Sequence, residues 1–178
     1  MELEEVKKRL EKLSRAQLGF FPTPVHKLEK LSKELGVNLY LKRDDLSGMN
    51  LFGGNKIRKL EYLIGDAIEK QCEYVFTFGA TQSNHAMQTA TVCCKCGLKP
   101  ILYLESIVDA DENDVRSNLL LDKIMGAEIH ILQEGIDLMQ EAQKRIDELE
   151  TQGHKCYIVP MGGANEICTD KTGTLTKN

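Results

Sequence analysis

A lysine that closely follows two glycines is the first residue of this sequence that could do chemistry. The string reads Gly53-Gly54-Asn55-Lys56, and residues at helical spacing follow it. Glycines let a ligand approach the backbone closely, and a partly desolvated lysine at a helix start has a lowered pKa. Such an amine can act as a nucleophile and form a Schiff base with an aldehyde. The alternative is a solvated loop lysine, the usual state of lysines in proteins.

A second polar stretch, GATQSNH over residues 79–85, lies between a predicted strand and a predicted helix. In an open parallel sheet, ligands bind beyond the carboxyl ends of the strands. Amides and short polar side chains at a helix start there can bind the oxygen atoms of a ligand or of a substrate carboxylate. Ser83 and Asn84 are therefore candidate site residues. Either could instead be only the N-cap of the helix, and His85 could be a packing residue or an acid or base.

Alternating strands and helices must position these two stretches. Runs of apolar residues separated by helices of about 10–15 residues predict βαβ units and a parallel sheet. The sequence thus predicts an α/β fold: an open parallel sheet with helices on both faces. The expected strands cover 74–78, 100–104, 128–132 and 156–159, and the expected helices run from the glycine turn through Ala67 and over 83–96, 115–125 and 136–149.

The part of the chain before the glycine turn has a different pattern. Leucines and a valine at helical spacing predict an amphipathic helix near the N-terminus. The string Phe-Pro-Thr-Pro at 21–24 interrupts it, because proline disfavours helix in the residue before it. A second helix should end at Gly36 as its C-cap, followed by a strand at 38–42.

Composition sets outer bounds on the function. The chain has 178 residues, 42% of them hydrophobic, which fits one domain or one domain with part of another. With a net charge of −4 and no basic block, nucleic-acid binding is not predicted. No run reaches the length of a membrane span, and the charged residues 1–13 lack the apolar core of a secretory signal. We therefore expect a cytoplasmic protein.

The six cysteines predict neither a disulfide framework nor a metal site. Cys93 and Cys96 form one CxxC string. A structural zinc site needs four ligands, and no second pair stands at suitable spacing. The favoured interpretation is thiols on a mostly buried helix.

Four long strings carry a resemblance to a known family. FPTPVHKLEKLSKELGVNLYLKRDDLSG, FGGNKIRKLEYL, GATQSNHAMQTA and SNLLLDKIMGAEI occur in this order and resemble D-cysteine desulfhydrases and aminocyclopropane-carboxylate deaminases. The resemblance covers about residues 17–165. It implies the tryptophan-synthase β-like fold, fold type II, of which this chain would be the N-terminal half.

The resemblance also implies an activity and a set of roles. Lys56 matches the lysine that holds pyridoxal 5'-phosphate and later moves a substrate proton, which makes it both catalytic and cofactor-binding. Asn55 and Asn84 match cofactor-binding positions, and Ser83 matches a catalytic serine near the substrate carboxylate. The implied enzyme is a lyase or deaminase that converts a small amino acid to ammonia and an oxo acid. When full length, it would be a homodimer.

We expect three regions along the chain. Residues 1–54 would belong to the large domain of such an enzyme, 55–160 to its small α/β domain, and 161–178 to a truncated or chimeric tail. Since the second half of the family's fold is not expected here, the main alternative is an inactive truncated α/β module.

The tail contains a second resemblance. Residues 170–176, DKTGTLT, are identical to the phosphorylation motif of P-type ATPases. A phosphorylated aspartate needs magnesium ligands from distant segments, and those pumps need membrane helices. We therefore expect a junction rather than an ATPase-like phosphoacceptor fragment, with Asp170 not phosphorylated.

Overall fold

An open parallel sheet forms the centre of the protein. The computed structural model describes residues 3–48, 53–106 and 115–161. The strand order is β5-β4-β3-β6, with β3 (Tyr74–Ala80) and β4 (Lys99–Ser106) in the middle. β5 (Glu128–Gln133) pairs with β4, and β6 (Cys156–Val159) pairs with β3, all in parallel. The predicted α/β fold with an open parallel sheet is confirmed.

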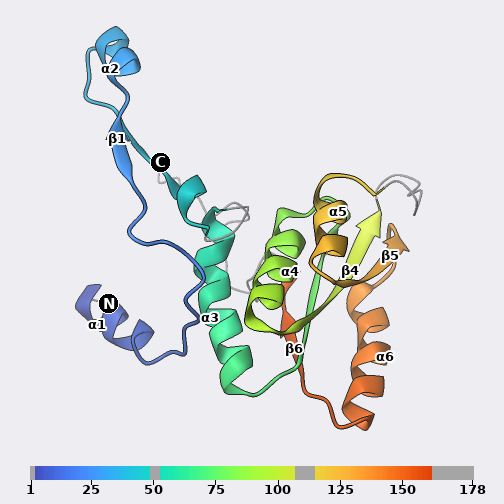
Figure 1. The fold of residues 1–178 in the computed structure, drawn as a ribbon. Helices are drawn as coiled ribbons and strands as arrows, with labels where there is room; N and C mark the ends of the chain where they lie inside the picture. The colour runs from blue at the N-terminus through green and yellow to red at the C-terminus, as the bar shows by residue number, and fades with distance from the viewer. Residues whose placement is uncertain (1–2, 49–52, 107–114, 162–178) are drawn as a thin grey trace.

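Helices cover both faces of this sheet (Figure 1). α3 (Asn55–Glu69), α4 (Asn84–Cys96) and α5 (Ser117–Ile124) lie on one face, and α6 (Leu138–Thr151) lies on the other. Side chains alternate along a strand, so neighbouring residues of β3 point to opposite faces. Val75 packs in the cluster with α3 and α4, whereas Phe76 packs with α6.

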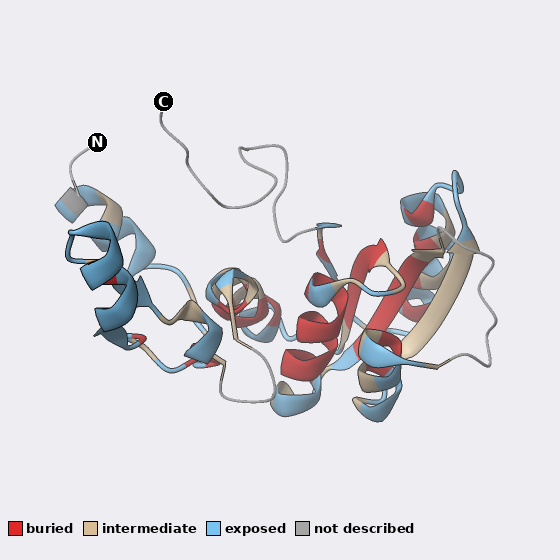
Figure 2. Cartoon of the chain, turned by 90° about the horizontal axis from the view of Figure 1, so that it is seen from above, coloured by how far each residue is buried: buried red, intermediate tan, exposed pale blue. Residues whose placement is uncertain are grey.

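The two central strands are buried on both sides, which explains their nearly continuous apolar sequence. Figure 2 shows the buried residues concentrated in these strands and in α4. In β4, Leu102 and Leu104 pack with α4 and α5, and Ile101 and Tyr103 pack with α6. The carboxyl edge of this sheet carries the connections from β3 to α4 and from β5 to α6.

Helix boundaries follow the predicted signals closely. Gly36 ends α2 and Gly97 ends α4, both in the left-handed region with φ of 68° and 72°. Glycine adopts this conformation without a Cβ clash, which is why it caps helices at the C-terminus. Gly126 follows α5 with φ of 75°.

The N-terminal part projects away from the sheet (Figure 1). It contains α1 (Leu3–Leu10), β1 (Val25–Lys27), α2 (Glu29–Leu35), β2 (Tyr40–Lys42) and a short 3-10 helix, η1 (Asp44–Leu46). β1 and β2 pair in antiparallel fashion around α2. The predicted strand at 38–42 corresponds to β2, whereas β1 was not predicted from the sequence.

A buried carboxylate joins the segment after α1 to α3. Glu61 of α3 is 1% exposed. Its Oε1 accepts from the backbone N–H groups of Leu18 and Gly19, each at 3.1 Å, and its Oε2 accepts from Arg15 Nε at 2.7 Å. The carboxylate therefore satisfies two buried backbone donors and pairs with a guanidinium.

A second buried carboxyl has no such partners. Asp122 of α5 is 1% exposed, and neither of its side-chain oxygens has a hydrogen-bond partner within the described part of the chain. Burial raises the pKa of Asp122 to about 7 from its ordinary 3.8. A buried carboxyl without a donor favours its neutral form, since the charged form has lost its water.

The cysteines in the described ranges are free thiols, with Cys93 buried and Cys94 exposed. Burial raises the pKa of the Cys93 thiol, so it is an unreactive core residue.

In residues 3–48, 53–106 and 115–161, no helix has the length and apolarity that crossing a membrane requires.

Candidate active site

Lys56 lies in the first turn of α3, two residues after a glycine with an unusual backbone. Gly54 precedes the helix with φ of 119°, a conformation that residues with a Cβ rarely adopt. The Lys56 side chain is half-buried. Burial, and then the nearby charge of Lys59, lower the pKa of Lys56 below its ordinary value. A larger fraction of Lys56 is therefore a neutral amine near neutral pH, as a nucleophile requires.

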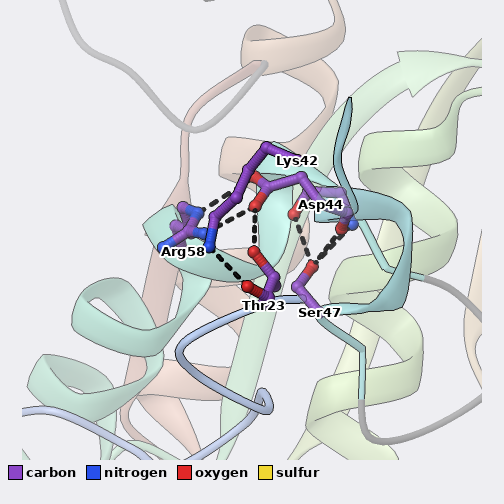
Figure 3. A network of polar contacts seen from close by, with 6 residues as sticks. Thr23, Lys42, Asp44, Ser47 and Arg58 are labelled. Carbon is purple, nitrogen blue, oxygen red and sulfur yellow. Dashed lines mark hydrogen bonds and ion pairs between the residues drawn. The ribbon is translucent and has the colours of Figure 1, made fainter. Parts of the chain in front are cut away.

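A polar network holds the backbone in front of Lys56 (Figure 3). Ser47 Oγ accepts from the Gly54 N–H at 2.8 Å and donates to the Asp44 carbonyl at 2.6 Å. The Asp44 carboxylate accepts from Arg58 of α3 at 2.6 Å and from the Thr23 hydroxyl at 3.1 Å. Hydrogen bonding to Arg58 lowers the pKa of Asp44, so the pair stays charged. The residues after β2 thereby fix the start of α3.

The glycine pair is also needed for space. A Cβ at Gly53 would lie 2.2 Å from the carbonyl oxygen of Asp45, much closer than atoms can approach. From the other side, Gln88 of α4 donates from Nε2 to the Gly53 carbonyl at 3.3 Å. This hydrogen bond brings the first residues of α3 against the second turn of α4.

Ser83 and Asn84 lie where β3 turns into α4, as the sequence predicted. Ser83 Oγ accepts from the Ala86 N–H at 3.2 Å, so Ser83 is the N-cap of α4. Gly79 makes room for it, since a Cβ there would lie 2.7 Å from Ser83 Oγ. A capping role and a ligand-binding role are compatible, because the hydroxyl can still donate its hydrogen.

Asn84 is held by a residue that was not predicted as part of the site. Asn118, in the first turn of α5, donates from Nδ2 to Asn84 Oδ1 at 2.9 Å. Asn118 also donates its backbone N–H to Gln82 Oε1 at 3.0 Å. With its oxygen so occupied, the Asn84 amide can present its Nδ2 hydrogens to a ligand. The position of Asn118 at a helix start after a central strand was the available sequence signal.

His85 is buried and neutral. It is 5% exposed, and its Nε2 lies 3.1 Å from both Thr77 Oγ1 and the Pro160 carbonyl oxygen. Burial, followed by the charge of Lys56, lowers the pKa of His85 to about 4. The imidazole therefore carries no charge at neutral pH, which favours the interpretation of a buried structural histidine over that of a cationic acid.

The structure thus brings the two predicted stretches to neighbouring helix starts. The Gln88–Gly53 hydrogen bond joins the two helices, and the charge of Lys56 contributes to the lowered pKa of His85. Asn55 lies exposed beside Lys56 at the start of α3. Convergence of the Ser83 and Asn84 side chains with Lys56 on one ligand remains a prediction.

Two buried serines provide a matched test of the network in Figure 3. Ser47→Ala should lower the free energy of unfolding by about 1–3 kcal/mol, because the Gly54 N–H loses its acceptor. Ser32→Ala should cost a similar amount, since Ser32 Oγ accepts from the Leu39 N–H at 3.0 Å within the β1–β2 unit. Only Ser47→Ala should change the rate at which Lys56 reacts with an amine reagent, as measured by peptide mapping. Equal rates in both variants would contradict a positioning role for Ser47.

The family comparison covers most of the chain. The profile described as "Pyridoxal-phosphate dependent enzyme" matches residues 16–176. The match includes residues 170–176, the string that resembles the ATPase motif, and the comparisons lend that resemblance no support. The structure of this string lies outside the described residues.

Two relatives and one solved structure that are similar to this chain are deaminases or desulfhydrases by their names. A 1-aminocyclopropane-1-carboxylate deaminase of Bradyrhizobium diazoefficiens is 40% identical over 161 residues, which are 87% of this chain and 48% of the relative. A D-cysteine desulfhydrase of Serratia proteamaculans is 38% identical over 164 residues, 91% of this chain and 49% of the relative. A crystal structure of an ACC deaminase homologue matches with a TM-score of 0.77 and 42% identity, over 93% of this chain and 49% of the other.

The chain spans about half the length of the curated relatives that it matches. The match to the solved structure supports the tryptophan-synthase β-like fold that the four sequence strings imply. With a profile match across residues 16–176, this chain belongs to the family of pyridoxal-phosphate-dependent enzymes.

Proposed function

We propose that this chain carries the cofactor-binding lysine of a pyridoxal-phosphate-dependent lyase or deaminase, with Lys56 as that lysine. The substrate class would be a small amino acid of the D-cysteine or aminocyclopropane-carboxylate type, and the products ammonia and an oxo acid. The observation that carries the proposal is the half-buried Lys56 amine with a lowered pKa, set at a glycine turn in a chain of this family.

The residues of the site fit pyridoxal phosphate. An aldehyde needs a neutral amine, and burial of Lys56 favours that form. The cofactor also carries a ring oxygen, to which the Asn84 amide can donate once Asn118 holds its Oδ1. Asn55, exposed at the start of α3, can contact the cofactor from the Lys56 side.

Each residue has a role that its chemistry allows. Bound pyridoxal phosphate would supply an electron sink for charge that develops on the amino acid. Lys56 would hold the cofactor covalently and, once released from it, take a proton from the substrate carbon or return one. Ser83 would donate its hydroxyl hydrogen to the substrate carboxylate at the start of α4. Asn84 and Asn55 would orient the cofactor.

The alternative function is that of an α/β module without activity. The chain covers 48% of the deaminase that it matches. Under the proposed function, residues 1–54 belong to a large domain and 55–160 to a small one, and the longer protein is a homodimer. Ammonia release from D-cysteine and from aminocyclopropane-carboxylate, measured with added cofactor, separates the active chain from the inactive module.

Borohydride reduction tests Lys56 directly. After incubation with pyridoxal phosphate and reduction, peptide mapping should find the modification at Lys56. Lys56→Arg should abolish this labelling, because guanidinium does not react with the aldehyde. Lys59→Arg serves as the matched control, one helical turn away, and should retain it. Labelling of Lys59 with Lys56 untouched would refute the assignment.

A further inference from the structure

Three side-chain amides join the turn before α4 to the start of α5. Gln82 binds the backbone on both sides of Ser117: its Nε2 donates to the Arg116 carbonyl at 3.3 Å, and its Oε1 accepts from the Asn118 N–H at 3.0 Å. In return, Asn118 Nδ2 donates to the Gln82 carbonyl and to Asn84 Oδ1, each at 2.9 Å. These hydrogen bonds fix where Asn118 lies relative to Asn84.

Backbone groups decide which way each amide points. The Gln82 carbonyl can only accept, so the Asn118 atom that faces it must be the nitrogen. That nitrogen has only hydrogens to offer, so Asn84 must face it with its oxygen. The Nδ2 group of Asn84, an exposed residue, is then turned away from Asn118. The chain without a ligand therefore already presents Asn84 as a hydrogen-bond donor.

The backbone at Ser117 has the shape that this arrangement needs. Ser117 has φ of 50°, in the left-handed region that residues with a Cβ seldom adopt. Such a conformation persists where surrounding contacts determine it. Here the flanking Arg116 carbonyl and Asn118 N–H are both bound by the Gln82 amide. Hydrogen bonds to Gln82 thus hold the residue that carries the Asn118 side chain.

We propose that Asn118 is a positioning residue: it holds the Asn84 amide so that its Nδ2 hydrogens face the ligand, which must then offer an oxygen that accepts. The identity of this oxygen rests on the proposed function, under which it is the ring oxygen of pyridoxal phosphate. The direction of the Asn84 amide does not rest on it, because the hydrogen bonds that set this direction lie within the chain.

Asn118→Asp reverses the polarity of the contact with little change in size. A carboxylate only accepts, so Asn84 must turn its Nδ2 group toward position 118. NMR of the full chain without cofactor measures hydrogen exchange of the side-chain amides. In the unchanged chain, the Asn118 hydrogens should exchange more slowly than those of Asn84. In Asn118→Asp, exchange of the Asn84 hydrogens should slow by about tenfold, as a hydrogen bond to a charged group predicts.

A pair of ligands tests what this direction does for binding. The probes are pyridoxal phosphate and its deoxy analogue, in which hydrogen replaces the ring hydroxyl, and equilibrium dialysis gives both dissociation constants. The unchanged chain should prefer pyridoxal phosphate by about tenfold, the effect of one hydrogen bond to a charged oxygen. Asn118→Asp should remove this preference. A general change in structure, or repulsion of the phosphate by the new charge, would weaken the binding of both probes equally.

Gln82→Glu is the matched control. It adds the same charge at the same turn, but its side-chain oxygen can still accept from the Asn118 N–H, and the backbone carbonyl that orients Asn118 remains. The preference for pyridoxal phosphate should therefore persist in this variant. Equal loss of the preference in both variants would mean that charge, and not the direction of the Asn84 amide, controls binding.

Two further outcomes would overturn the inference. One is an exchange rate of the Asn84 amide that is the same in the unchanged chain and in folded Asn118→Asp. The other needs no variant and decides the question if Asn118→Asp fails to fold: in the unchanged chain, slower exchange at the Asn84 side chain than at Asn118 would show that the amides point the other way.

Failure of the proposed function would look different. If the exchange rates change as expected but pyridoxal phosphate does not label Lys56, the proposed function is wrong, and the orienting contact between Asn118 and Asn84 stands. If Lys56 is labelled and the exchange rates do not change, only the positioning role of Asn118 is wrong.

Discussion

Glu61→Ala is expected to lower the free energy of unfolding by about 2–6 kcal/mol, because it leaves two buried backbone N–H groups unsatisfied, each at a cost of about 1–3 kcal/mol. The substitution leaves the backbone N–H groups of Leu18 and Gly19 without an acceptor, and it leaves the Arg15 guanidinium without its partner. Urea unfolding followed by circular dichroism measures the change. A loss below about 1 kcal/mol would show that water satisfies these donors.

Glu61→Gln is the matched variant. Its amide oxygen can still accept from the two backbone N–H groups, while the charge that pairs with Arg15 is gone. We expect a smaller loss than for alanine, because only the charge is removed. Glu69→Gln provides a further control on the same helix, since Glu69 is exposed.

Asp122→Asn should make the protein more stable at pH 8, by on the order of 4 kcal/mol at most. The pKa of Asp122 is about 7 in the folded protein and ordinarily 3.8. Between these values the folded state binds more protons than the unfolded state, so stability falls as the pH rises from about 4 to 7. Above this window the folded protein bears the full cost of a buried charge.

Comparison of pH curves isolates this group. His85 acts in the opposite sense, because its lowered pKa makes stability rise between about pH 4 and 6.5. Subtracting the curve of Asp122→Asn from that of the unchanged chain removes such shared contributions. The exposed Asp147 of α6 supplies the control, and Asp147→Asn should leave the curve unchanged. Parallel curves for Asp122→Asn and the unchanged chain would mean that this carboxyl is not desolvated.

The sequence predicted the sheet and most of its helices because their signals are local. Central strands read as apolar runs, and Gly36 and Gly97 mark helix ends through a conformation that favours glycine. β1 was not predicted because it has only three residues, of which Val25 and His26 are exposed. Its pairing with β2 also depends on residues about 15 positions away. The strand lacks the alternation of apolar and polar residues that indicates a half-buried strand.

Local signals also placed some of the candidate site residues at helix starts, whereas contacts between distant residues could not be predicted. Lys56, Ser83 and Asn84 stand at helix starts, which the local order of glycines, apolar runs and short polar residues indicates. The contact of Asn118 with Asn84 spans 34 positions and needs α5 to lie beside α4. Likewise, the position of the hydrogen on the His85 ring depends on the Pro160 carbonyl, 75 positions away. The local sequence around Glu61 is that of an exposed glutamate, and its burial depends on contacts with residues 18 and 19.

The pairing of β6 with β3 has a consequence for the order of events during folding. Thr77 and Val159 meet although 82 positions separate them, whereas β3, β4 and β5 pair with their nearest neighbours along the chain. Closing so long a loop has an entropic cost that the other contacts must first offset. We therefore expect β6 to dock late. His85 then gains its carbonyl acceptor only in that late step, so the surroundings of Lys56 mature after the rest of the sheet has formed.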